Sequence, residues 1–283
     1  MLFRSYVETE SGQLVGVTSL RNLLTHPPST RLADIMTTDV IAVEPQVDQE
    51  EVARIAGRYD LLAVPVVDEH RKLLGIVTVD DVIDVIREEA AEDMLLMAGV
   101  GEESAEPQGG RLMVAARRLP WLLVTLAGGV AISEIIRRFN GVLSTDLVLA
   151  GFIPMLTGMS GNVGIQSATL TVRNIAVGKL DTGVGGRVAG EALTGLLLGL
   201  VFSMLIGLYC MLRYGDLHTA LAVGIAISCN TTAAALMGTL VPLTLRRAGV
   251  DPAIATGPFV TTGMDGVGVT IYLSIATLLL SLW

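Results

Sequence analysis

The chain has 283 residues, of which 51% are apolar and 17% are charged, and its formal net charge is −9. Its mean hydropathy of +0.62 averages two very different parts. Residues 1–110 contain 21 Asp and Glu against 8 Lys and Arg, whereas residues 111–283 contain 7 against 11. An acidic part of this kind excludes a nucleic-acid-binding protein and is better suited to attract cations than anionic lipid.

The acidic part contains an internal repeat. The run from Leu14 to Leu24 and the run from Leu73 to Ile83 share one pattern, in which a β-rich segment, a glycine, a second β-rich segment and a helix follow one another. Ser19 and Thr78 stand at equivalent positions before the helix, and both are good N-cap residues. Each copy therefore predicts a β-hairpin followed by a helix.

This repeat resembles a pair of CBS modules. The second module is expected at residues 31–88, with strands at 41–43, 63–67 and 74–77, and helices from about 48 to 59 and from 79 onward. The first module, at residues 1–30, lacks its opening half, so we expect the sequence to be part of a longer protein. The polar N-terminus lacks the apolar core of a secretion signal, which favours a cytosolic location for this part.

An acidic helix and a linker follow the second module, and we assign residues 89–118 to this connecting region. The helix is expected from Asp80 to about Val100, and residues 102–110, rich in Gly, Pro and Glu, read as the linker. The acidic side chains of this helix alone would be explained by a solvated face. The alternative is a surface that binds cations.

The remaining residues, 119–283, contain five apolar segments and predict an all-α membrane domain. The segments lie at about 119–137, 143–177, 188–213, 218–245 and 253–282, each long enough to cross a bilayer. With the N-terminal part in the cytosol, seven Lys and Arg near the span ends face the cytosol and three face outside. The sequence therefore predicts a multi-pass protein of the cell membrane with its C-terminus outside.

The second apolar segment has an unusual composition. It is too long for one regular span and contains Pro154, Gly158, Gly161 and Gly164, so we expect a broken or glycine-rich helix that is buried or lines an aqueous cavity. Within it, residues 154–166 read PMLTGMSGNVGIQ. Asn162 and Gln166 are four residues apart and share one helix face, where their amide oxygens can coordinate water or a cation.

Asp265 is the one charged residue between Ala253 and Trp283. A carboxylate in the middle of a span costs several kcal/mol unless it faces a partner, a water-filled cavity or a cation, so it marks a functional site by default. The structural alternative is an Asp that is protonated or paired with a Ser or Thr. Glu191, near a span end, is expected to reach the membrane surface or to pair with Arg187 at the i, i+4 spacing.

Taken together, the Gly-Asn-x-Gly-x-Gln string, the Asp251-Pro252-Ala253 run before Asp265 and the CBS pair with its acidic helix resemble the MgtE family of magnesium channels. The resemblance covers the whole chain. It implies α/β CBS modules followed by five transmembrane helices, a homodimer, and a pore between the two subunits. Asp265 would hold hydrated Mg²⁺ through its waters, with Asn162, Gln166, Gly161 and Gly164 contributing to the pore. Mg²⁺ suits such a site because it gives up its waters reluctantly.

The resemblance also implies regulatory Mg²⁺ sites that close the pore when cytosolic Mg²⁺ is high. The residues that would bind it are Asp48, Glu50, Asp60, Asp81, Asp84, Glu89, Glu92 and Asp93. One departure from the family pattern is Gly257, since other members carry Asn immediately before this proline. The change is harmless if only the backbone carbonyl is used, and it alters the pore lining if the side chain contributes.

A second ligand is suggested by Gly75-x-x-Thr78-x-x-Asp81, which resembles the ribose-contacting string of nucleotide-binding CBS modules. ATP or another adenine nucleotide is therefore a candidate ligand, although Thr78 is equally an ordinary helix N-cap. Two rivals to a passive Mg²⁺ channel remain open: an ion-coupled Mg²⁺ exchanger, and a nucleotide-sensing CBS regulatory subunit with a membrane anchor. The sequence has no P-loop and no HExxH motif, so neither an ATP-driven pump nor a zinc protease is expected.

Overall fold

The computed structural model describes residues 4–100, 110–177, 183–255 and 257–281. The chain divides into two compact units, residues 1–91 and residues 92–283, and the boundary falls within one helix, α4 (Val79–Met97). Of the linker expected at residues 102–110, residues 102–109 lie outside the described residues.

The described part of the first unit contains two β-hairpins, three short helices and the part of α4 up to Ala91. Strands β1 (Arg4–Glu8) and β2 (Leu14–Ser19) form one antiparallel hairpin, and β3 (Ala63–Val67) and β4 (Leu73–Thr78) form the other. The helices before α4 are α1 (Leu20–Thr25), α2 (Leu32–Ile35) and α3 (Gln49–Arg58). The predicted repeat is therefore confirmed as two hairpins, each followed by a helix.

The starts of α1 and α3 follow from their capping residues. Ser19 accepts a hydrogen bond from the Asn22 backbone N–H, and Asp48 caps α3 by accepting one from Glu50. The core of the second module is apolar: Val43, Val52 and Val64 are buried together with Val82 of α4. The prediction of a strand at residues 41–43 is wrong, because Val43 forms only an isolated parallel bridge to Val66.

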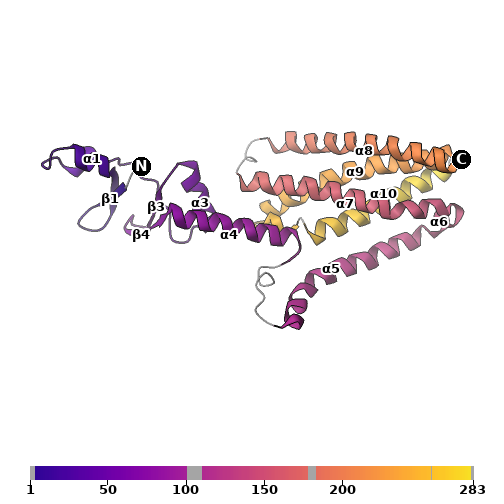
Figure 1. Cartoon of the computed structure of the whole chain (residues 1–283), viewed down its shortest axis with the longest axis horizontal. Helices are drawn as coiled ribbons and strands as arrows, with labels where there is room; N and C mark the ends of the chain where they lie inside the picture. The colour runs from indigo at the N-terminus through magenta and orange to yellow at the C-terminus, as the bar shows by residue number, and fades with distance from the viewer. Residues whose placement is uncertain (1–3, 101–109, 178–182, 256, 282–283) are drawn as a thin grey trace. The chain divides into compact units, whose positions relative to one another are not determined.

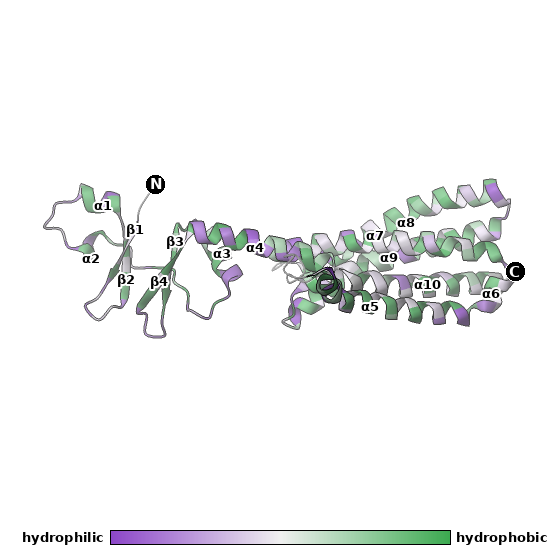
Figure 2. Ribbon diagram, turned by 60° about the horizontal axis from the view of Figure 1, so that its bottom comes forward, coloured by the Kyte–Doolittle hydropathy of each residue, from purple (hydrophilic) through white to green (hydrophobic). Residues whose placement is uncertain are grey.

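Among its described residues, the second unit contains five helices that are long and apolar enough to cross a membrane, and they run side by side (Figure 1). They are α5 (Arg111–Arg138), α7 (Leu147–Ala176), α8 (Val184–Tyr214), α9 (Leu217–Arg247) and α10 (Pro258–Ser281). Two short elements, α6 (Asn140–Thr145) and the 3₁₀ turn η2 (Pro252–Ala255), precede α7 and α10. Most residues of these helices have hydrophobic or intermediate hydropathy, whereas hydrophilic residues are frequent in the first unit (Figure 2).

The predicted break in the second apolar segment occurs at a different place. The helical structure is interrupted at Asp146, which accepts a hydrogen bond from the Val148 N–H and so caps α7. From Leu147 to Ala176 the helix continues through Pro154 and its glycines without interruption. One proline removes a single backbone hydrogen bond, and the packing of α7 against its neighbours outweighs that loss.

Glycines let α7, α8 and α9 approach closely. A Cβ on Gly199 of α8 would lie 2.7 Å from the Ser228 Cα of α9. A Cβ on Gly238 of α9 would overlap the Gly164 carbonyl oxygen of α7 and lie 3.0 Å from the Ser167 Cβ. Small residues at such contacts are typical of membrane helix packing.

Candidate functional site

Asp265 lies two turns into α10, on a surface bordered by contacts to two other helices. Thr261 and Met264 of α10 face Gly161 and Gly164 of α7. On the other side, Thr262 packs against Gly128 of α5, and Gly266 lies near Ile132. Asp265 is therefore placed by α10 between α5 and α7, and it is partly buried.

The Asp265 carboxylate has no hydrogen-bond or ion-pair partner among the residues that the structure describes. Pairing with a Ser or Thr, the structural alternative raised by the sequence, is therefore not seen in the described part of the chain. A carboxylate within an apolar span and without such a partner is costly in free energy. This cost favours a role in which a cation or water contacts the carboxylate.

The four motif residues of α7 divide between two faces of the helix. Gly161 and Gly164 are buried at the contact with α10, where a side chain at Gly164 would overlap Met264. Asn162 and Gln166 are both exposed in the single chain, together with Gly151, Pro154 and Gly158 along the same side of the helix. The glycines thus set the distance between α7 and α10, and the amides lie on an uncovered face.

An uncovered amide face on a membrane helix requires an explanation. Asn and Gln side chains gain little in contact with lipid, because the bilayer core offers their amide groups no hydrogen-bond partners. The lipid-facing residues of α8 are, in contrast, large and apolar, such as Leu193, Leu197, Leu200 and Met204. The exposed face of α7 therefore has the chemistry of a surface that contacts water or another protein chain.

Polar contacts join α7 to α8, α9 and α10. At one end, Thr219 of α9 donates to Asp146, and the Tyr272 hydroxyl of α10 donates to the Leu149 carbonyl at 2.8 Å. Near the motif, Asn230 of α9 donates to the Leu156 carbonyl. Toward the other end, the Ser167 hydroxyl donates to Glu191 of α8 at 2.9 Å. Glu191 therefore accepts a hydrogen bond from α7, and the ion pair with Arg187 considered from the sequence is not present among the described residues.

Gly257 contacts the end of α4. A Cβ on Gly257 would lie 3.0 Å from the Met97 carbonyl oxygen and 3.2 Å from the Gly99 nitrogen. Its own carbonyl accepts hydrogen bonds from the Thr261 N–H and the Thr261 hydroxyl. A glycine therefore suits this position, because a longer side chain would press on the last turn of α4.

The predicted regulatory carboxylates lie along the second module and α4. Asp48 caps α3, Glu89 accepts a hydrogen bond from Gln49 at 2.8 Å, and Asp84 lies 3.8 Å from Arg87. Asp60 has a positive φ of 49° at the end of the turn after α3. Glu50 lies in the first turn of α3, and Glu92 and Asp93 lie in α4. No three acidic, His or Cys side chains among the described residues come together as a metal-binding group.

Thr78 and Asp81, the nucleotide-contacting candidates, bond to each other. The Thr78 hydroxyl donates to the Asp81 carboxylate at 2.6 Å, and the Thr78 N–H donates to the same oxygen. This is the arrangement of a helix start. In the single chain the pair therefore acts as a cap.

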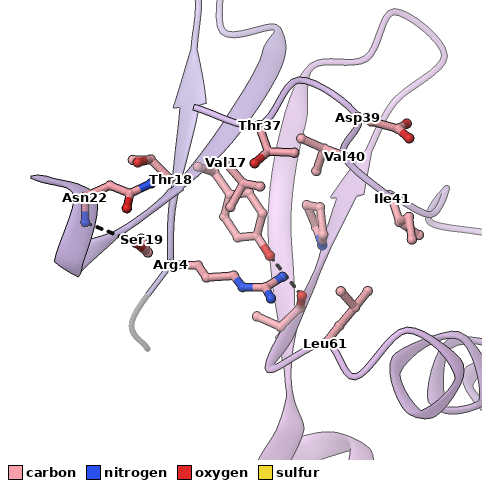
Figure 3. A pocket seen from close by; sticks show the side chains of 13 residues that line it. Arg4, Val17, Thr18, Ser19, Asn22, Thr37, Asp39, Val40, Ile41 and Leu61 are labelled. Carbon is pink, nitrogen blue, oxygen red and sulfur yellow. Dashed lines mark hydrogen bonds between the residues drawn. The ribbon is translucent and has the colours of Figure 1, made fainter. Parts of the chain in front are cut away.

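A pocket of about 310 Å³ lies instead at the equivalent positions of the first repeat copy (Figure 3). Ser19 and Asn22, which correspond to Thr78 and Asp81 in the repeat, both line it. Arg4 extends into the pocket from β1 and has no ion-pair partner among the described residues. Burial raises the pKa of the Tyr6 hydroxyl, and the charge of Arg4 lowers it by a smaller amount. The sequence did not lead us to predict this pocket, although the repeat aligns Ser19 and Asn22 with the nucleotide-contacting candidates Thr78 and Asp81.

Comparison with known proteins gives two family matches. Residues 153–275 match the MgtE family, described as divalent cation transporters, and residues 32–88 match the CBS domain. Among curated relatives, a magnesium transporter MgtE of Enterococcus faecalis is 41% identical over 98% of this chain and 61% of its own length. The corresponding protein of Thermus thermophilus is 42% identical over 99% of this chain and 62% of its own length. The chain thus spans about three fifths of these relatives.

Two solved structures are also similar in sequence over part of the chain. One is the soluble part of a magnesium transporter, 50% identical over 32% of this chain and 35% of its own, with a TM-score of 0.31. The other is the cytosolic domain of the Mg²⁺ channel MgtE in complex with ATP, 52% identical over 30% and 34% of the two chains, with a TM-score of 0.29.

Proposed function

We propose that this chain, which belongs to the MgtE family of divalent cation transporters, carries Mg²⁺ across the cell membrane as a passive channel. The family is one of transporters and not of enzymes. The observation that carries the proposal is Asp265, a carboxylate inside a span without a partner in the described residues, beside the glycine-rich helix α7. Such a group needs a cation or water.

The exposed face of α7 supports a pore between two copies of the chain. Asn162 and Gln166 on this face would be covered in a homodimer and would offer amide oxygens to the waters of a hydrated ion. Two Asp265 carboxylates, one from each copy, would repel each other unless a cation lies between them. Mg²⁺ keeps its octahedral water shell readily, so a frame of oxygen acceptors of the right width selects it by the size of the hydrate.

Flux into vesicles tests the channel proposal. The chain is reconstituted with a trapped Mg²⁺ indicator, and Mg²⁺ is added outside with no gradient of Na⁺ or H⁺. A passive channel gives flux that follows the membrane potential set by K⁺ and valinomycin. Flux that requires an opposing Na⁺ or H⁺ gradient would identify the exchanger instead, and a chain with no flux would fit the regulatory subunit.

Gating by cytosolic Mg²⁺ is proposed to act through α4. Its last turn contacts Gly257, directly before α10, so a shift of α4 reaches the helix that carries Asp265. Glu89, Glu92 and Asp93 lie on α4, and in a dimer their charges would repel those of the other copy. Mg²⁺ bound among them would remove this repulsion and draw α4 into the position that closes the pore.

Neutralising Glu92 and Asp93 together, as Glu92→Gln and Asp93→Asn, is expected to leave the channel conducting at millimolar Mg²⁺. The reason is that the bridging ions lose their ligands while the α4 backbone and its contact with Gly257 stay in place. Flux is measured against the Mg²⁺ concentration on the side of the acidic part. The pair Glu10→Gln and Asp34→Asn, which removes two exposed charges elsewhere in the acidic part and outside the pocket lining, is the control. Normal inhibition in the Glu92 and Asp93 variant would remove these residues from the gate.

A second ligand, an adenine nucleotide, is proposed for the pocket of the first unit. The pocket combines the free guanidinium group of Arg4 with the polar side chains of Ser19, Asn22 and Thr37 and the apolar wall of Val40 and Leu61. The apolar wall suits a base, the hydroxyl and amide groups suit a ribose, and an arginine suits a phosphate.

Replacing Arg4 by Ala is expected to weaken ATP binding about tenfold, because a charge-assisted contact to phosphate is lost. Titration calorimetry on the full chain measures the affinity. Arg31→Ala is the matched control, since it removes the same charge from the first unit outside the pocket lining. Equal affinity of the Arg4 and Arg31 variants would place the phosphates elsewhere, and adenosine should bind both variants alike.

A further inference from the structure

A buried amide on α9 links the two helices of the candidate pore. Asn230 is only 2% exposed and lies near the middle of α9, within the most buried span of the bundle. An apolar residue of similar size would fill this place without the desolvation cost of an amide. The presence of a buried amide therefore calls for a specific task, as it does elsewhere in membrane interiors.

On one side, Asn230 binds α7. Its Nδ2 donates to the Leu156 carbonyl oxygen at 3.4 Å, and this oxygen also accepts from the Ser160 hydroxyl. Leu156 stands six residues before Asn162 in the same unbroken helix. The bond therefore holds α7 less than two turns from Asn162 and less than three turns from Gln166, the amides that face the proposed pore.

On the other side, Asn230 lies against α10. A Cβ on Gly268 would be 2.6 Å from the Asn230 Oδ1 and 2.8 Å from its Nδ2, so only glycine leaves room for the amide. Gly268 stands three residues after Asp265, on the next turn of α10. One side chain of α9 thus contacts α7 and α10 at the level of the candidate site, although α9 itself carries none of the predicted pore residues.

We propose that Asn230 is a positioning residue, which sets the distance between the Asp265 carboxylate and the amides of Asn162 and Gln166. This inference rests on the proposed transport of Mg²⁺. Discrimination by the size of a hydrated ion depends on where the oxygen acceptors stand, so a small movement of α7 against α10 changes which ion fits. The contacts of the Asn230 amide with α7 and α10 hold these two helices at one separation, whereas an apolar side chain at the same place would let them slide past each other.

Two substitutions act on the amide from opposite sides. Asn230→Leu removes the hydrogen bond to α7 and keeps the volume, and Gly268→Ala keeps Asn230 and displaces its amide. For each, Mg²⁺ and Ca²⁺ flux into vesicles is measured over a range of concentrations, and thermal unfolding is measured in detergent. We expect the ratio of Mg²⁺ to Ca²⁺ flux to fall about tenfold or more, with a raised KM for Mg²⁺, while the Tm of Asn230→Leu stays within a few degrees of wild type.

A double variant that combines Asn230→Ala with Gly268→Ala separates the positioning role from a folding defect. Asn230→Ala removes the atoms that a Cβ at position 268 would meet, so Gly268→Ala should add little to it, and the two effects should not sum. Additive effects, or flux that falls in proportion to folded protein with an unchanged ion ratio and KM, would overturn the positioning role. A wild-type chain without Mg²⁺ flux overturns the proposed function as well, whereas wild-type flux with an unchanged ratio in Asn230→Leu overturns this inference alone.

Discussion

Replacing Asp265 by Asn is expected to abolish Mg²⁺ flux while leaving the bundle folded. At about 5 Å and an effective dielectric constant of about 20, a carboxylate and a divalent ion attract each other by several kcal/mol. Each loss of about 1.4 kcal/mol lowers affinity tenfold, so flux should fall by about 100-fold or more. Asn has nearly the same shape as Asp, and the carboxylate has no partner in the described residues whose loss would unfold the chain.

The measurement compares flux with thermal stability in the same preparation. The Asn variant should unfold at or above the wild-type temperature, since an uncompensated charge inside the span is removed. Asp216→Asn serves as a control, because Asp216 caps α9 and accepts from Thr219, so its loss should lower stability more than conduction. Undiminished Mg²⁺ flux in Asp265→Asn would remove Asp265 from the pore.

Replacing Gly238 by Val is expected to prevent α7 and α9 from packing. A Cβ at this position would overlap the Gly164 carbonyl oxygen and lie 3.1 Å from the Ala168 nitrogen, and both are backbone atoms that cannot rotate away. Overpacking of this kind costs about 1–3 kcal/mol when side chains can adjust, and more where they cannot. Because Gly164 also faces Met264, the displacement would be passed on to α10 and the candidate site.

Thermal unfolding in detergent and size-exclusion chromatography report this effect. We expect a lower Tm, loss of the folded peak and loss of flux together. Gly190→Ala is the matched control on α8, where a Cβ would meet nothing within 4 Å, and it should leave all three unchanged. A stable and active Gly238→Val protein would show that α7 and α9 do not approach as closely as described.

The sequence predicted the elements whose signals are local. The strand at Ala63–Val67 and the start of α3 after Asp48 were predicted correctly, because β-branched runs and capping side chains act within a few residues. The interruption of the second apolar segment was placed wrongly, because it depends on packing between helices and not on local signals alone. Pro154 and the glycines indicate a break in a helix only where no neighbouring helix packs against it. Here Gly161 and Gly164 pack against α10.

The candidate site could be predicted only in part. Asp265 and the Asn162 and Gln166 pair were visible because a charge or an amide in an apolar run is conspicuous. Asn230 was passed over, because a polar residue among Ser, Thr and Cys has no spacing that reveals what it contacts, and its partners are far away in the chain. The pocket of Ser19 and Asn22 was missed although the repeat aligned these residues with Thr78 and Asp81, since which copy is open depends on tertiary packing.

The uncovered amide face of α7 has a consequence for the biosynthesis of the protein. A newly inserted single chain exposes Asn162 and Gln166 to lipid that cannot hydrogen-bond them. In the proposed homodimer a second copy covers this face, so a single chain is poorly matched to the bilayer until it meets its partner, and its lifetime in the membrane should depend on how soon that happens.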